Sequence, residues 1–282
     1  MIERSEAALF ERIEAFYDAV PRDRAQVESF GPLTLFVADP EGLPLYARPA
    51  LHAFGAPTVD DIRTVRERQR ELDVPEAFEW VQESTPSLGA MIEAEGLTIL
   101  HAPLMVLEPA RLRAFAPSVS TPVRLLDPDR ETFAEDLSSF RAIAQVSFAA
   151  SGMAVGLSGP AERDEVRAPA LDVEVTGERV RAKQAAYALA GEGPDGALAG
   201  GAFQRAGDVV EIVGVATLPS ARRGGLGAAV TAALAREALV SGAALVILSA
   251  GSDDVARVYA RLGFRRVGTA CIAAPVDADV PG

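Results

Sequence analysis

A strand, a glycine-rich turn and the start of a helix follow one another directly between residues 209 and 240. The apolar run Val209–Thr217 predicts a strand, and the periodic residues from about 226 to 240 predict a helix. Between them lies Arg222–Gly227, which contains two arginines and three glycines. Such a junction leaves backbone N–H groups unpaired at the helix N-terminus, with the positive end of the helix dipole behind them. The sequence therefore predicts an anion site, where Gly225 and Gly227 let a phosphate approach the backbone and the arginines add charge.

Two other phosphate-binding loops fail on details of this run. A Walker loop needs Lys followed by Ser or Thr after its last glycine, and here Ala228 and Ala229 occupy those positions. The dinucleotide fingerprint needs a third glycine where Val230 stands, and it opens a βαβ unit, whereas this run follows a predicted series of hairpins. Both motifs are therefore excluded.

The rest of the chain divides at a break in pattern. Residues 114–122 contain two prolines and three hydroxyl residues between longer periodic segments, which predicts a linker. We expect one domain over residues 1–117 and a second over residues 121–282.

In the second half, alternation and helical spacing predict an α/β (α+β) domain with a mixed, mostly antiparallel sheet flanked by helices. The expected strands are 123–126, 180–190, 197–205, 208–217, 243–248 and a final pair, 264–267 and 269–274; the expected helices are 131–149, 226–240 and 253–261. Residues 150–170 are expected to be a loop with one short helix.

The first half is predicted to contain helices over 3–20 and 59–72 and a strand over 33–37, closed by a turn at 39–42. Residues 90–97 and 103–107 form a helix-glycine-strand pattern that parallels the pattern after Val258. This similarity suggests an internal repeat.

The loop resembles motif A of the GNAT superfamily of acyl-CoA-dependent N-acetyltransferases, Arg/Gln-x-x-Gly-x-Gly/Ala, with Arg222, Gly225 and Gly227 at the matching positions. A second motif of that family, Tyr-x-x-Leu-Gly-Phe, is matched from Tyr259 to Phe264. The resemblance covers about 122–274. It implies that the first half is a degenerate GNAT-like copy, which would hold no coenzyme A because it lacks this loop.

The resemblance also implies direct transfer of an acetyl group from acetyl-CoA to a primary amine of a small molecule or peptide. It assigns the diphosphate to the backbone of Arg222, Arg223, Gly224, Gly225, Leu226, Gly227 and Ala228. The pantetheine arm is expected beside Val213, Val215 and Thr217, with the N–H of Val215 polarising the thioester carbonyl.

Three side chains complete the expected site. Glu211 matches a general base of the family; the alternative is a carboxylate on the outer, solvated sheet face. Tyr259 matches the acid that protonates the departing thiolate; the alternative is a core aromatic with a satisfied hydroxyl. Ser252 stands where the family commonly has an asparagine that contacts pantetheine, and could instead cap a helix.

Composition limits the partners. With 27 basic and 40 acidic side chains the formal charge is −13, which argues against nucleic acid and favours a cationic acceptor. The acidic residues Glu162, Asp164 and Glu165 lie in the loop region that the resemblance to the GNAT superfamily implies would border that acceptor. Two histidines and one cysteine exclude a Cys- or His-rich metal site, so no metal is expected. No apolar run reaches 18 residues, so no membrane association is expected, and the cytoplasm is the expected location. Monomer and homodimer remain open.

Four remaining residues are expected to be structural: His52, His101, Trp80 and Cys271, the last as a small buried hydrophobe.

Two rival functions remain. A non-catalytic acyl-CoA sensor or scaffold would keep the loop but need neither Glu211 nor Tyr259, and a nucleotide-phosphate binder would need only the loop.

Overall fold

The computed structural model describes residues 2–38, 45–114, 122–150 and 152–275. The turn predicted at 39–42 and most of the predicted linker lie outside these residues. The helices are α1 (Ile2–Arg22), α2 (Val59–Glu71), α3 (Leu88–Ala94), α4 (Pro109–Ala114), α5 (Phe133–Ala149), α6 (Pro160–Val166), α7 (Val173–Arg181), α8 (Leu226–Val240) and α9 (Asp253–Leu262). The strands are β1 (Ala25–Phe30), β2 (Leu33–Ala38), β3 (Ala47–Pro49), β4 (Phe78–Val81), β5 (Leu97–Leu107), β6 (Val123–Leu125), β7 (Ala185–Ala190), β8 (Ala199–Ala206), β9 (Val209–Thr217), β10 (Leu245–Ser249) and β11 (Phe264–Pro275).

The chain forms two compact units. Unit 1 comprises Met1–Leu104 and Val267–Gly282, and unit 2 comprises Met105–Arg266. The boundaries therefore fall inside β5 and β11, because each of these long strands begins in one unit and ends in the other. The boundaries predicted from sequence, at 117 and 121, lie outside the described residues and stay a prediction.

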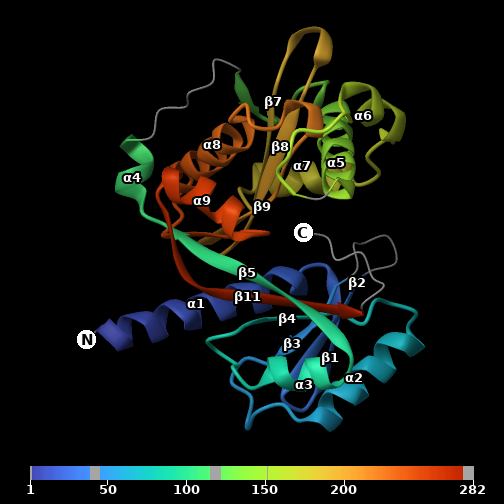
Figure 1. The fold of residues 1–282 in the computed structure, drawn as a ribbon, viewed down its shortest axis with the longest axis vertical. Helices are drawn as coiled ribbons and strands as arrows, with labels where there is room; N and C mark the ends of the chain where they lie inside the picture. The colour runs from blue at the N-terminus through green and yellow to red at the C-terminus, as the bar shows by residue number, and fades with distance from the viewer. Residues whose placement is uncertain (1, 39–44, 115–121, 151, 276–282) are drawn as a thin grey trace. The chain divides into compact units, whose positions relative to one another are not determined.

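Unit 2 is built on a sheet with helices on both faces. Strands β6, β7, β8 and β9 pair antiparallel in that order, and β10 pairs parallel with β9. Helix α8 covers one face and α5 the other (Figure 1). Two adjacent glycines of β8 allow both helices to approach closely. A Cβ atom on Gly200 would lie 2.9 Å from Phe140 of α5, and one on Gly201 would lie 2.9 Å from Val230 of α8.

Unit 1 repeats the order of elements found in unit 2. In both halves of the sequence, a helix is followed by three strands, a helix, a strand, a helix and a final strand: α1 to β5 in the first half, and α7 to β11 in the second. The pairing repeats as well, since β1, β2 and β3 are antiparallel neighbours and β3 is parallel to β4. Helices α2 and α3 share a core with these strands.

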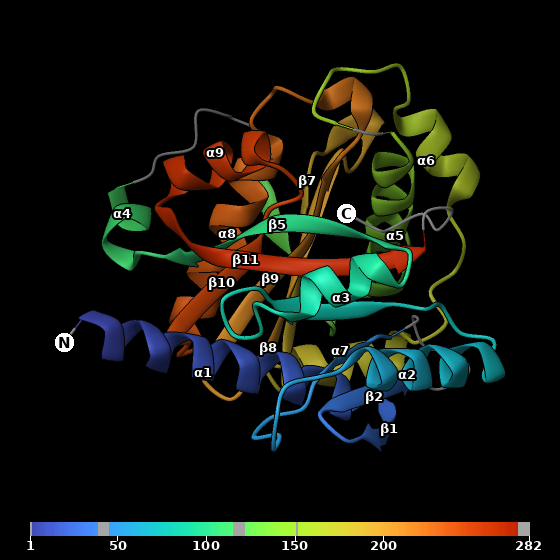
Figure 2. The same ribbon diagram turned by 60° about the horizontal axis from the view of Figure 1, so that its bottom comes forward.

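The final strands of the two repeats are exchanged. In unit 1, β11 pairs antiparallel with β4, with Cys271 opposite Trp80, and β5 lies on the far side of β11 (Figure 2). In unit 2, the end of β5 lies beside β10. Each unit therefore contains a strand segment from the other half of the sequence. The predicted fold class, a mostly antiparallel mixed sheet flanked by helices, is confirmed.

Two sequence expectations for unit 2 were wrong. The predicted final strand pair is the single strand β11. The strand expected from 180 begins at Ala185, because α7 continues to Arg181. The β-branched residues of α7 are typical of a strand. In the structure they form a helix whose buried face contains Thr176 and Gly177, and Phe133 lies 3.5 Å from the position of a Cβ on Gly177.

We predict that Gly201→Val destabilises the protein by about 1–3 kcal/mol, because the added methyl groups would overlap α8. The matched control is Gly251→Ala, where a Cβ meets nothing within 4 Å; it should change the free energy of unfolding by less than about 0.5 kcal/mol. Urea denaturation measures both. Equal stability of the two variants would contradict the close packing of α8 on β8.

We further predict that residues 1–117 and 121–282 do not fold stably when produced separately, because each fragment lacks a strand segment that completes its sheet. Co-expression of the two fragments should yield a soluble complex with the circular dichroism and thermal transition of the intact chain. Cooperative unfolding of either fragment alone would contradict this expectation.

Candidate functional site

The site lies in unit 2, where β9 and β10 part. Their parallel pairing covers three positions, ending at Glu211 opposite Ile247, although β9 continues to Thr217. Beyond Glu211, no strand of the described chain pairs with this edge of β9. Exposed strand edges of this kind can bind an extended ligand through main-chain hydrogen bonds.

A β-bulge in β9 explains why the strands part. The register with β8 jumps from Val213 opposite Ala202 to Ala216 opposite Gly200, so that Gly214 and Val215 lie opposite one residue. Gly214 has φ +61°, in the left-handed region where a Cβ is costly. A bulge bends its strand and strengthens the local twist, which turns the end of β9 away from β10.

The loop after β9 leads to an uncapped helix. Arg223 has φ +67° and Gly225 has φ +81°, and these left-handed residues turn the chain into α8 at Leu226. Gly225 is the N-cap and has no side chain to accept from the first turn. The N–H groups of this turn therefore point outwards with the helix dipole behind them.

The close approach of α8 to β9 places these N–H groups beside the open edge. A Cβ on Gly227 would lie 3.4 Å from Oγ1 of Thr217 and 3.8 Å from Cγ1 of Val215. Hydrogen-bond donors suited to an anion thus lie next to an unpaired strand edge. This arrangement fits a ligand with a phosphate group and an extended arm. The predicted residues from Val213 to Ala228 lie in this one region.

The corresponding helix of unit 1 has a closed N-terminus. The hydroxyl of Thr58 accepts from the N–H of Asp61, and the Asp61 carboxylate accepts from the backbone N–H of Thr58 at 2.8 Å. Asp60 adds a second negative charge in the first turn. This end of α2 carries its own anion and would repel a phosphate.

The side chain of Arg222 has a different role from the one predicted. Its Nη2 donates to the carbonyls of Ser147 and Ala150, both at 2.8 Å, and its Nη1 donates to the carbonyl of Ala154 at 3.2 Å. The guanidinium thus adds hydrogen-bond donors at the C-terminal end of α5, where the helix dipole is negative. Arg222 therefore does not present its fork to a phosphate, whereas Arg223 is exposed and forms no side-chain hydrogen bond to the described chain.

Glu211 is buried within the sheet. It is 7% exposed and its Oε2 accepts from Nε2 of Gln204 at 3.0 Å. Gln204 lies on the α5 face, because side chains alternate and Gly200 of the same strand faces α5. The solvated alternative is therefore excluded, and the role of Glu211 as a base stays a prediction.

Tyr259 is also buried, with its ring 6.1 Å from that of Phe264. Its hydroxyl is hydrogen-bonded to the side chain of Thr231, and the hydroxyl of Thr231 donates to the carbonyl of Gly227 at 2.8 Å. Burial raises the pKa of Tyr259 to about 12, so the phenol keeps its proton at neutral pH. Sequence reasoning missed Thr231, which links Tyr259 to the first turn of α8.

Ser252 caps α9. Its hydroxyl accepts from the N–H of Val255 at 3.3 Å, which is the second of the two roles expected for it. A contact between Ser252 and pantetheine stays a prediction.

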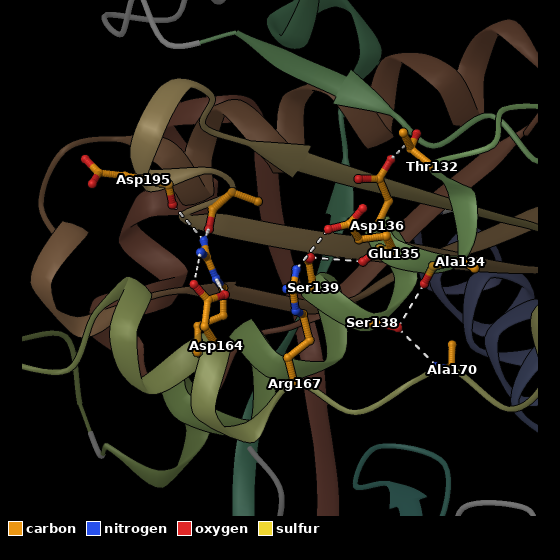
Figure 3. A network of polar contacts seen from close by, with 12 residues as sticks. Thr132, Ala134, Glu135, Asp136, Ser138, Ser139, Asp164, Arg167, Ala170 and Asp195 are labelled. Atoms are coloured by element: carbon orange, nitrogen blue, oxygen red, sulfur yellow. Dashed lines mark hydrogen bonds and ion pairs between the residues drawn. The ribbon is translucent and has the colours of Figure 1, made fainter.

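The acidic cluster of α6 is largely occupied by structural contacts. The N–H of Gly159 donates to Glu162 at 2.6 Å and holds the pKa of that carboxyl below its usual value. The guanidinium of Arg163 does the same for Asp164, while also donating to the carbonyl of Asp195. Figure 3 labels Asp164 and Asp195 within this network of polar contacts. Glu165 alone among the three has no such contact in the described chain. Recognition of a cationic acceptor by this cluster stays a prediction.

The residues expected to be structural include Cys271, which is 1% exposed. Its Sγ lies 3.6 Å from Nδ1 of His101, and burial raises the pKa of its thiol to about 11, so it is no nucleophile at neutral pH. Trp80 is 3% exposed in the core of unit 1, and His52 occupies an exposed left-handed turn with φ +58°.

Comparison with known proteins identifies the fold. Residues 191–272 match the family model described as FR47-like protein, which is related to the GNAT superfamily. A GCN5-related N-acetyltransferase from Kribbella flavida is 24% identical with a TM-score of 0.69, and the match covers 96% of this chain and 97% of that one. No curated protein sequence matches.

Two further solved structures have the same fold. A GCN5-related N-acetyltransferase from Sphaerobacter thermophilus is 14% identical with a TM-score of 0.54, covering 92% of this chain and 86% of its own. A tandem GNAT protein from the clavulanic acid biosynthesis pathway is 16% identical with a TM-score of 0.52, covering 86% and 78%. The chain therefore has the GNAT fold, and the resemblance predicted from the loop and the tyrosine motif is confirmed.

Two classes of feature are absent from the described residues. None of their helices is both long and apolar enough to span a bilayer. Their His, Cys, Asp and Glu side chains form no group of three or more suited to holding a metal ion.

We predict that Tyr259 makes stability fall at high pH. A pKa of about 12 in the folded state, against 10.0 when unfolded, means that its contribution is complete below pH 10 and is lost as the pH rises to 12. The loss should approach roughly 2–3 kcal/mol. Urea denaturation from pH 9 to 12 should give a shallower fall for Tyr259→Phe than for the wild type, and parallel curves would contradict the burial of this phenol.

Proposed function

We propose that the protein is an N-acetyltransferase that moves an acetyl group from acetyl-CoA directly to a primary amine of a small molecule or peptide. The observation that carries the proposal is the open edge of β9 beside the uncapped N-terminus of α8. The GNAT fold and the N-acetyltransferases among its structural neighbours support it.

The donor would be held by main-chain groups. The backbone from Arg223 to Ala228 would bind the diphosphate, with the exposed guanidinium of Arg223 adding charge. The edge of β9 at Val213, Val215 and Thr217 would bind the pantetheine arm, and the N–H of Val215 would donate to the thioester carbonyl. Acetyl-CoA supplies an activated acyl group, so the protein needs no nucleophile of its own.

Two buried side chains are suited to proton transfer. Glu211, on the α5 face of β9, would accept a proton from the amine, because an ammonium group has no lone pair with which to attack. Tyr259, which retains its proton at neutral pH, would donate to the departing thiolate once its bond with Thr231 is given up.

We predict that Glu211→Gln and Tyr259→Phe each lower turnover by about 10²–10⁴-fold, because each removes one proton-transfer group. The dissociation constant for coenzyme A, measured by calorimetry, should change by less than about threefold in both. The matched control Glu178→Gln, at an exposed position of α7, should leave both quantities unchanged. Turnover is measured as coenzyme A released against libraries of amines and alcohols.

Three other outcomes would each reject the proposal. Binding of coenzyme A with no turnover on any acceptor would indicate the acyl-CoA sensor. Tighter binding of ATP than of coenzyme A would indicate a nucleotide-phosphate binder. Turnover with alcohols alone would overturn the amine acceptor.

A further inference from the structure

The end of α5 and the loop after it are tied to the glycine loop. We use the term clamped segment for residues 147–150 and 152–159. Arg222 donates to three carbonyls of this segment, from Ser147, Ala150 and Ala154, and its Nε donates to the carbonyl of Thr217 at 3.4 Å. One guanidinium therefore connects the end of β9, the end of α5 and the loop beyond it.

The turn before Arg222 adds further contacts to the clamped segment. The N–H of Gly156 donates to the carbonyl of Pro219 at 3.0 Å, and the N–H of Ser220 donates to the carbonyl of Ser158 at 2.9 Å. Packing is equally close, since a Cβ on Gly156 would lie 2.9 Å from Cβ of Pro219. These contacts join the clamped segment to the turn that leads into the glycine loop.

The clamped segment belongs to the face of the sheet that carries Glu211. Helix α5 covers this face, and its last turn is the part that Arg222 holds. A change in the glycine loop can therefore reach the α5 side of the site through a short path of hydrogen bonds.

We propose that Arg222 is a positioning residue that couples the donor loop to the clamped segment, so that binding of coenzyme A orders the α5 side of the site. This inference rests on the proposed donor. The adjacent arginines then have separate tasks: Arg223 binds the diphosphate, and Arg222 holds the protein around it. Arginine suits the second task because its planar fork can donate to several carbonyls at once.

Hydrogen exchange with mass spectrometry tests the coupling, with Arg223→Ala as the matched control for Arg222→Ala. In the wild type, coenzyme A should slow amide exchange both in residues 223–228 and in the clamped segment. Arg222→Ala should speed exchange in the clamped segment by roughly tenfold without coenzyme A, and should abolish the effect of coenzyme A there while residues 223–228 are still protected. Its dissociation constant for coenzyme A should change by less than about threefold.

Arg223→Ala should give the reverse pattern, with coenzyme A bound roughly five- to tenfold more weakly and exchange in the clamped segment unchanged. Arg222→Lys, which keeps the charge but loses the planar fork, should resemble Arg222→Ala in a protein that remains folded. The inference is overturned if Arg222→Ala weakens binding as much as Arg223→Ala does, or if coenzyme A still protects the clamped segment in Arg222→Ala. If the wild type binds no coenzyme A, the proposed function fails first, and faster exchange in Arg222→Ala alone still establishes the clamp.

Discussion

The parting of β9 from β10 is the feature on which the site depends. Paired along its whole length, β9 would have no main-chain groups left for a ligand, and the N-terminus of α8 would face a closed sheet. The bulge at Gly214 and Val215 provides the bend, and Gly214 accepts the left-handed backbone it requires. Gly201, opposite the bulge, lets α8 approach closely enough to bring its first turn beside the open edge.

The two repeats differ at the helix that follows their third strand. In unit 2 the N-cap of this helix is Gly225, which has no side chain to accept from the first turn. In unit 1 the N-cap is Thr58, whose hydroxyl accepts from the N–H of Asp61. The order of elements is the same in both repeats, so the difference between an open and a closed helix N-terminus depends on a few residues. The carboxylates of Asp60 and Asp61 would disfavour an anion at this helix terminus, and the absence of coenzyme A from the first half stays a prediction.

Sequence reasoning recovered the features that depend on local signals. The glycine loop, α8, the helix carrying Tyr259 and the order of strands around them follow from periodicity and turn residues, as does the cap at Ser252.

Features that depend on distant contacts were missed. The exchange of β5 and β11 cannot be read from periodicity, since an exchanged strand has the same pattern as one that stays in its own sheet. Arg222 was expected to face a phosphate because charge beside a glycine loop suggests that role, whereas the carbonyls at the end of α5 come from a segment far away in the sequence. Thr231 has no signal of its own, because its hydroxyl acquires meaning only from the tyrosine beside it.

The exchanged strands also constrain how such a chain can evolve. A duplicated half that no longer binds a ligand is ordinarily free to be deleted. Here deletion of the first half would remove the end of β5 from the sheet of the second half. It would also remove β4 and β5, which are the neighbours of β11. The exchange of strands alone therefore favours retention of the first half, because β11 and the end of β5 need elements of both halves as neighbours.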